Sequence, residues 1–327
     1  MILLLSSDGD YSTNLIIKWL KHYKCFDFIR LNPMDFVDNK ILIYPSDGVF
    51  IYNDKPFNFS SIKVVWYRRF GGYSSTSHYF KVKKEIDQSV SDLLKFEINN
   101  ILDYFVSLLP KNAEIIGSTS RSNTNKLIEL YNAKLVGLNV PTTFITSRKK
   151  DVEQCLRSGQ KLISKSAYNA LGIGYNHQHY TMFTSEIIQS DINMLPDVFF
   201  PSLVQEKLEK DYEVRIFYFL GQFFCMAIIS QDNPQTKIDF RKYDIKKPNR
   251  FVPCEIDSVT KTKIKEFMNN MNLNIGSLDF VKTISGELFF LEVNYMGQFG
   301  MVDFPCNYGI HKFIAETLIN RDLYERF

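Results

Sequence analysis

Short apolar runs alternate with helical patterns over the first 118 residues of the chain. Ile2 to Leu5 is typical of a buried strand, and apolar residues recur at helical spacing from Ser12 to Tyr23. Lys81 to Leu109 predicts one long helical region that Pro110 ends. Further strands are expected at 26–31, 40–44, 49–52, 61–67 and 114–117. The alternation predicts a small open α/β domain, although no GxGxxG dinucleotide fingerprint follows the first strand.

A different pattern runs from residue 119 to about 198. Helices are expected at 123–138 and 151–158, and strands at 140–144 and 161–165. A segment with Gly172 and Gly174 follows. Such a loop lets backbone N–H groups approach phosphates, while a plain hairpin is the simpler interpretation of a short glycine pair.

Strand patterns dominate from residue 199 to residue 327. They include a hairpin around Gly221, a polar and basic loop at 231–250, and helices at 260–271 and 308–320. A chain of 327 residues is too long for one ordinary core, so two or three domains are expected. The pattern changes divide it into 1–118, 119–198 and 199–327.

Asp279, Glu292 and Asn294 are the most informative residues. Asp279 lies in a predicted strand, and Glu292 and Asn294 lie in its predicted return strand, so a hairpin brings the three together. Glu292 and Asn294 are two residues apart and therefore share a face. Three oxygen donors at one point suit Mg²⁺, which phosphates and water complete. The alternative is a polar hairpin with surface carboxylates.

Basic residues on separate elements complement this acidic hairpin. Lys126, Lys165, Arg215 and Arg241, with a metal ion, would neutralise about four negative charges of a triphosphate. Each alone is more often a solvated surface charge. Arg215 lies inside an apolar strand and shares a face with Glu213, and a charge in such a place needs a partner or a ligand.

Composition narrows the class of protein. The hydrophobic fraction is 45% and the charged fraction 23%, as in globular proteins. A net charge of +3, from 39 basic and 36 acidic residues, gives no indication of a nucleic-acid partner. No apolar run approaches the roughly 18 residues of a membrane span, and the apolar start is too short for a signal peptide. Five cysteines without a CxxC pair indicate free thiols in a reducing cytoplasm.

The succession of these residues resembles the ATP-grasp superfamily over residues 119–327. The segments SLDF at 277–280 and LEVN at 291–294 are its most specific part. Phe290 to Asn294, followed by Gly297 to Gly300, is similar to the peptide maturases of graspetides, the microviridin-like macrocyclic peptides. The tail 301–308 and the Trp66-to-Arg69 motif are most similar to the grasp-with-spasm type. One departure is Tyr295, where many relatives carry proline.

The resemblance implies a set of site roles. ATP would lie between two α+β subdomains, 119–198 and 199–327, under the Gly172–Gly174 lid, with 1–118 as a pre-ATP-grasp domain. Lys126 and Lys165 would contact its phosphates, and Glu213 its ribose. The metal ligands for one or two Mg²⁺ would be Asp279, Glu292 and Asn294. Arg215 and Arg241 would face the phosphate and the incoming carboxylate. Backbone groups would line the adenine along one stretch, namely Gln205, Glu206, Lys207 and Leu208.

The implied activity is an ATP-dependent ligase that closes rings on a precursor peptide with a leader and an acidic, hydroxyl-rich core. Asp or Glu side chains would become acyl phosphates and join Ser or Thr hydroxyls, or Lys amines. One alternative is an ATP-grasp ligase for a free amino acid or amine, which would share the phosphate and metal residues. Another is an inactive nucleotide- or peptide-binding protein. Homodimers are common in the resembled family, but no residue here decides the oligomeric state.

Overall fold

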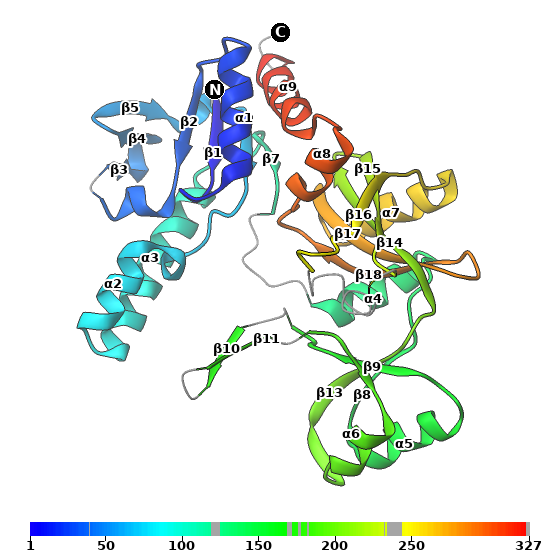
Figure 1. The fold of residues 1–327 in the computed structure, drawn as a ribbon. Coiled ribbons are helices and arrows are strands. Elements are labelled where there is room, and N and C mark those ends of the chain that lie inside the picture. The colour runs from blue at the N-terminus through cyan, green and yellow to red at the C-terminus, as the bar shows by residue number, and fades with distance from the viewer. Residues whose placement is uncertain are drawn as a thin grey trace. The chain divides into compact units, whose positions relative to one another are not determined.

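The computed structural model of the chain describes residues 1–38, 40–118, 125–168, 172–175, 178–181, 183–231, 233 and 244–324. It contains two compact units, one formed by 1–122 with 309–327 and the other by 123–308 (Figure 1). The last helix thus groups with the N-terminal unit, whereas the predicted division kept 199–327 together. The three-part division stays a prediction.

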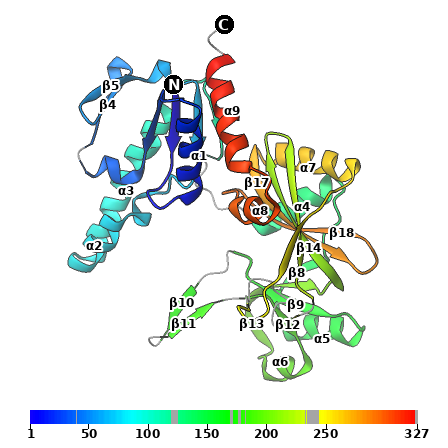
Figure 2. The same ribbon diagram turned by 45° about the horizontal axis from the view of Figure 1, so that its top comes forward.

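The first unit is an α/β domain, as its sequence pattern predicted (Figure 2). Its main sheet is parallel, with the strand order β2-β1-β6-β7. A small antiparallel sheet, β3-β4-β5, adjoins the same core. The strands are β1 (Ile2–Leu5), β2 (Phe28–Leu31), β3 (Ile41–Tyr44), β4 (Val49–Tyr52), β5 (Lys55–Asn58), β6 (Val64–Tyr67) and β7 (Glu114–Ile116). The helices are α1 (Tyr11–His22), α2 (Ser77–Glu85), α3 (Gln88–Ser107) and α9 (Ile310–Tyr324).

The single helix predicted from Lys81 to Leu109 is wrong, because the chain breaks between α2 and α3. Ile86 has an extended backbone, and Asp87 caps the N-terminus of α3 by accepting a hydrogen bond from the Ser89 N–H at 2.8 Å. Aspartate is favoured at a helix N-cap and disfavoured inside a helix because its short side chain competes for backbone donors. The break therefore follows from a capping signal within an otherwise periodic run.

The motif Trp66 to Arg69 is mostly structural. Trp66 and Tyr67 end β6 inside the core, and the Trp66 indole N–H donates to Thr13 Oγ1 at 3.0 Å. The Arg68 guanidinium lies 3.2 Å from Asp10, and both side chains are buried. Burial lowers the pKa of Arg68 to about 10 although Asp10 opposes the shift. Only Arg69 of the four is exposed.

The second unit contains two larger sheets. The first has the order β12-β9-β13-β8, and α5 and α6 cover one of its faces. The second has the order β16-β15-β14-β17-β18 and is antiparallel. A separate hairpin pairs β10 (Gly172–Tyr175) with β11 (Gln178–Thr181). The other strands are β8 (Thr143–Arg148), β9 (Leu162–Lys165), β12 (Ser185–Ile187), β13 (Val198–Glu206), β14 (Lys210–Phe219), β15 (Gln222–Ile229), β16 (Arg250–Pro253), β17 (Ile275–Thr283) and β18 (Leu288–Asn294). The helices are α4 (Lys126–Leu135), α5 (Lys149–Arg157), α6 (Gln189–Met194), α7 (Ser258–Asn270) and α8 (Gly300–Cys306).

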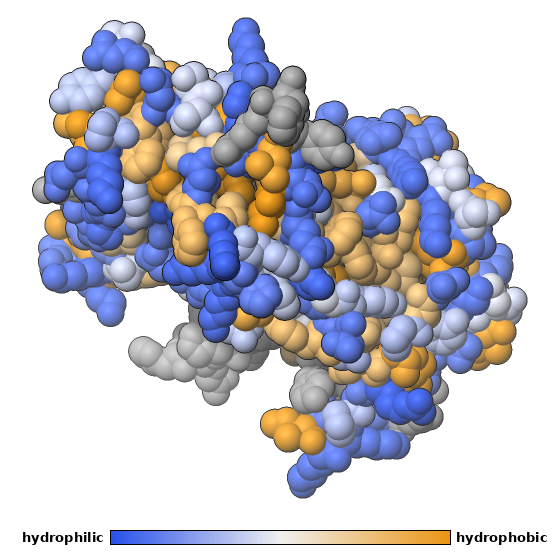
Figure 3. All heavy atoms as spheres, turned by 90° about the horizontal axis from the view of Figure 1, so that it is seen from above, coloured by the Kyte–Doolittle hydropathy of each residue, from blue (hydrophilic) through white to orange (hydrophobic). Residues whose placement is uncertain are grey.

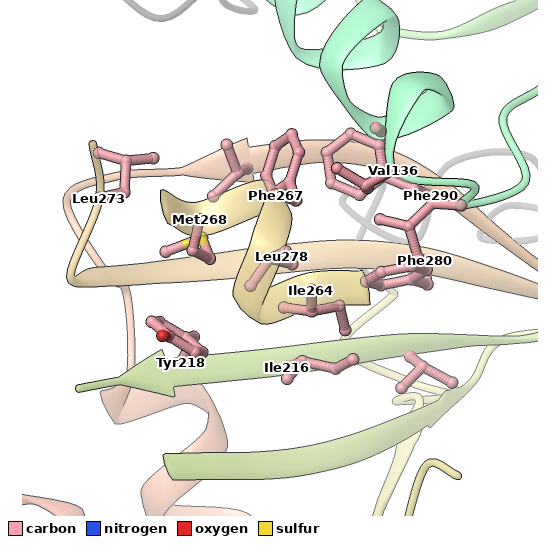
Figure 4. Packing of buried hydrophobic residues seen from close by; sticks show 14 of the residues in the cluster. Val136, Ile216, Tyr218, Ile264, Phe267, Met268, Leu273, Leu278, Phe280 and Phe290 are labelled. Atoms are coloured by element: carbon pink, nitrogen blue, oxygen red, sulfur yellow. The ribbon is translucent and has the colours of Figure 1, made fainter. Parts of the chain in front are cut away.

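The main core of this unit lies between the five-stranded sheet and helices α4 and α7. Alternate strand residues such as Ile216, Leu278 and Phe280 point toward Ile264 and Phe267 of α7 (Figure 4). This alternation leaves the opposite face of the sheet for Arg215, Asp279 and their neighbours. The hydrophobic layer therefore supports a second, polar face of the same strands.

One residue is added to β18 beside the polar face. Asp279 is opposite Glu292, but Phe280 is opposite Phe290, so Leu291 has no partner in the ladder. Regular alternation would put Phe290 and Glu292 on one face. The bulge instead lets Phe290 pack 4.9 Å from the Phe267 ring in the core while Glu292 stays beside Asp279.

No helix in the described part of the chain is long and apolar enough to cross a membrane. On the face drawn in Figure 3, hydrophobic residues are interspersed with hydrophilic ones.

Candidate functional site

The two predicted carboxylates lie side by side on β17 and β18. Asp279 and Glu292 are direct cross-strand partners, and Asn294 is the partner of Ser277 two residues further along. Directly opposed residues in an antiparallel pair have neighbouring side chains on one face. The predicted hairpin is therefore confirmed. The role of its three oxygen donors as metal ligands stays a prediction.

Each carboxylate has a cation beside it. Lys126 Nζ lies 2.9 Å from Glu292 Oε2, and Arg215 Nη1 lies 3.6 Å from Asp279 Oδ1. Lys126 is the first residue of α4, where the Asn125 side chain caps the helix by accepting from the Leu127 N–H at 2.9 Å. Lys126 and Arg215 are both buried. The structure therefore brings four predicted site residues together as two ion pairs.

Arg215 is further oriented by the segment after β18. Its Nη2 donates to Gln298 Oε1 at 3.2 Å, and Nη1 contacts Met301 Sδ at 3.6 Å. The planar guanidinium can face several acceptors at once. Gln298 and Met301 were not predicted as site residues, although both lie in the segment that carries the family resemblance.

Gly297 holds this segment close to the sheet. Its φ is +54°, and a Cβ atom built there would lie 3.0 Å from Phe217 Cε2. The Phe217 ring has little freedom to retreat, because it is buried with its centroid 4.9 Å from that of Phe299. Both the backbone conformation and the limited space therefore favour glycine at this position.

Gly297→Ala is expected to destabilise the protein more than Gly286→Ala. Gly286 also has a positive φ, +86°, but an added Cβ meets nothing within 4 Å. The control should cost only the backbone strain, about 1–2 kcal/mol, whereas Gly297→Ala adds about 1–3 kcal/mol of overpacking. Urea denaturation followed by circular dichroism measures both. Equal costs would contradict the close approach to Phe217.

The donor set fits a magnesium ion that is shared with a phosphate. Asp279, Glu292 and Asn294 supply hard oxygen atoms, and Asn294 Oδ1 also accepts the Met296 N–H at 3.0 Å. Within the described residues, no group of three or more His, Cys, Asp or Glu side chains is placed to hold a metal ion. Two carboxylates and an amide suit Mg²⁺ with phosphate and water as its remaining ligands, rather than a cation enclosed by protein.

Glu213 lies on the same strand and face as Arg215, as predicted, but is already engaged. It is 6% exposed and forms an ion pair with Lys210, and it accepts a hydrogen bond from Ser230 Oγ at 2.6 Å. Burial raises the pKa of Glu213, although Lys210 and Ser230 counteract the shift. Its role toward a ribose stays a prediction.

The remaining predicted residues lie elsewhere in the second unit. Lys165 ends β9 and is half-buried, with Leu203 of β13 as its ladder partner. At the end of β13 the Gln205 side chain donates to Thr143 Oγ1 at 2.8 Å, and Glu206 accepts the Thr142 N–H at 2.9 Å. The stretch ends with two half-buried residues, Lys207 and Leu208.

The predicted lid glycines form part of a hairpin. Gly172 and Gly174 lie in β10, opposite Thr181 and His179, so they belong to a paired strand rather than to a loop. Arg241 lies outside the described residues.

Glu129 is a residue of this site that the sequence pattern did not reveal. It is 1% exposed, and its Oε2 accepts the Val293 N–H at 3.0 Å, between Glu292 and Asn294. The available signal was its spacing, because residues three apart on a helix share a face. Glu129 therefore follows Lys126 on the side of α4 that meets β18.

Solved structures of other proteins share the fold of this chain. No protein-family model matches the chain, and no curated protein matches it. Macrocyclase MdnC from Microcystis aeruginosa, solved with a precursor peptide, aligns with a TM-score of 0.80 and 23% identity over 98% of this chain and 99% of its own. A RiPP-associated ATP-grasp ligase from Chryseobacterium gregarium, solved with ADP and a leader and core peptide, gives 0.81 and 23% over 98% and 96%.

A third solved structure is the ATP-grasp ligase PsnB, complexed with minimal precursor, Mg and ADP. It aligns with a TM-score of 0.76 and 16% identity over 98% of this chain and 97% of its own. All three alignments span nearly the whole chain, the N-terminal α/β unit included. The protein therefore has the ATP-grasp fold with an N-terminal α/β domain.

Proposed function

We propose that the protein is an ATP-dependent peptide macrocyclase that binds ATP with Mg²⁺. The observation that carries the proposal is the Asp279–Glu292 pair, flanked by Lys126 and Arg215, within an ATP-grasp fold. The three structural neighbours are solved with precursor, leader or core peptides, and two of them with ADP. This combination supports an enzyme that binds a nucleotide at this site and acts on a carboxylate of a peptide.

The proposed reaction has two steps. A side-chain carboxylate oxygen of the peptide attacks the γ-phosphorus of ATP, ADP leaves, and an acyl phosphate forms. A Ser or Thr hydroxyl, or a Lys amine, of the same peptide then attacks the acyl carbon, loses its proton and expels phosphate. The product is an ω-ester or ω-amide ring, and no protein nucleophile is required.

The residues of this chain would hold and neutralise the reacting anions. Asp279, Glu292 and Asn294 would hold Mg²⁺, which offsets phosphate charge when it is bound. Lys126 and Lys165 would bind phosphate oxygens, and Arg215 and Arg241 would reduce the repulsion between phosphate and carboxylate. With Glu292 engaged as a metal ligand, Lys126 would bind a phosphate oxygen in place of its present partner, Glu292.

Other parts of the chain would complete the site. The stretch Gln205 to Leu208 would line the adenine, with Glu213 at the ribose. The hairpin that contains Gly172 and Gly174 would close over the nucleotide and exclude water, because an acyl phosphate hydrolyses in open solvent. Residues 1–118 would act as the pre-ATP-grasp domain. A cytoplasmic location belongs to the same proposal, and a homodimer is compatible with it.

The test is the mass of the peptide. Incubation with ATP, Mg²⁺ and the small peptide encoded beside the gene is expected to remove about 18 Da per ring, because each condensation expels water. A reaction without ATP is the control. ADP release with a free amino acid and an unchanged peptide would instead indicate a ligase for small amines. Absence of ADP with every acceptor would indicate a binding protein.

A further inference from the structure

Helix α4 contacts β18, the strand that carries two of the proposed metal ligands, through two charged residues. One contacts a side chain of the strand, and the other contacts its backbone. Lys126 reaches the Glu292 side chain, whereas Glu129 reaches the backbone N–H of Val293. Val293 is the residue between two proposed ligands, and its own side chain is buried in the core. Glu129 therefore contacts the peptide unit that joins Glu292 to Val293, one of the two peptide units between Glu292 and Asn294.

The contact lies on the outer edge of the sheet. β18 is the last strand of the order β16-β15-β14-β17-β18, so no further strand of the described part of the chain extends the sheet beyond it, and only an isolated bridge joins Asn139 to Phe289. Two backbone N–H groups of β18 find other acceptors, since Phe290 N–H donates to the Asn139 carbonyl at 2.8 Å and Val293 N–H donates to Glu129 at 3.0 Å. These two anchors flank the bulge at Leu291, where the regular ladder is interrupted.

Burying a carboxylate to accept the Val293 N–H has a large desolvation cost. Glu129 is 1% exposed, and a buried charge is costly compared with a neutral acceptor. Its position in the first turn of α4 compensates part of that cost, because the helix N-terminus favours negative charge. A hydrogen bond to a charged acceptor is also stronger than one to a neutral acceptor. The arrangement suits a strand, β18, whose backbone must stay fixed at Val293.

We infer that Glu129 is a positioning residue that fixes the backbone of β18 and thereby presets Glu292 and Asn294 for the metal ion. It does not touch substrate or metal in this role. The inference rests on the proposed function, because it assigns a second layer of support to the same site. Partners of metal ligands typically change metal affinity by about 10- to 100-fold when they are removed.

The test combines Glu129→Leu, which removes the acceptor, with Glu129→Gln, which keeps one. Glu153→Leu is the matched control, because Glu153 is a glutamate on α5 whose partner is Arg157. Two quantities are measured in the folded proteins. One is the exchange rate of the Val293 amide hydrogen without nucleotide, and the other is the Mg²⁺ concentration that half-saturates ADP binding in calorimetry.

Glu129→Leu is expected to speed Val293 exchange and to raise the half-saturating Mg²⁺ concentration by about 10-fold or more. Glu129→Gln is expected to bring the Val293 exchange rate and the half-saturating Mg²⁺ concentration most of the way back to those of the unaltered protein. Glu153→Leu is expected to change neither quantity. Unchanged exchange or an unchanged Mg²⁺ requirement in Glu129→Leu would overturn the inference, as would a Glu129→Gln variant as impaired as the leucine variant. If the unaltered protein bound no ADP at any Mg²⁺ concentration, the proposed function itself would fail.

Discussion

Ring formation is expected to be lost when Glu292 is replaced by glutamine, while peptide binding persists. The substitution keeps the shape of the side chain but removes a negative charge beside Asp279 and Lys126. Loss of one electrostatic contact in a reacting site typically lowers kcat by about 10²–10³-fold. Mass spectrometry of the peptide measures the ring, and anisotropy of a labelled peptide measures binding.

Glu287→Gln provides the control on the same hairpin. Glu287 lies between β17 and β18, where Ser285 Oγ donates to its carboxylate at 3.1 Å, and it should tolerate the change. Normal turnover by Glu292→Gln would show that the metal assignment is wrong. Equal losses of turnover and of peptide affinity would place Glu292 in peptide binding instead.

Arg215→Lys is the second substitution with a large expected effect. The guanidinium faces Asp279 with one nitrogen and donates to Gln298 with another, and a single ammonium group cannot reproduce both contacts. A residue that acts on charge developing in the transition state affects kcat and kcat/KM together. The expected loss is about 10²–10³-fold in each, with little change in the KM for ATP.

The measurement is the rate of ADP release with the peptide present, as a function of both substrates. Arg250→Lys is the control, because Arg250 is exposed on β16 of the same sheet. A rate for Arg215→Lys within about twofold of the unaltered protein would remove Arg215 from the mechanism, since it is the fork geometry that the lysine lacks.

Local signals made part of this site predictable. The β17–β18 hairpin follows from two apolar strands around Ser285-Gly286, and the shared face of Glu213 and Arg215 follows from alternation along β14. The ATP-grasp fold was also predictable, because Lys126, Lys165, Asp279 and Glu292 follow one another along the chain in the order that resembles that superfamily. These features depend on neighbours in sequence or on order, both of which a single chain displays.

Contacts between distant elements were not predictable. Nothing near Lys126 indicates that its partner would be Glu292, and the contact of Glu129 with Val293 depends on how α4 packs against the sheet edge. The bulge at Leu291 was missed because strict alternation puts Phe290 and Glu292 on one face. The break at Asp87 was missed because periodicity alone carries no information on a cap.

The unpaired Leu291 also determines how this hairpin responds to shortening. Losing a residue from a regular strand inverts the facing of every side chain beyond the gap, which usually destroys the core. β18 already contains one residue more than its partner needs. Deleting Leu291 would leave Phe290 and Val293 facing inward and Glu292 and Asn294 facing outward. We therefore expect the hairpin to tolerate the loss of this one residue while keeping the same interior.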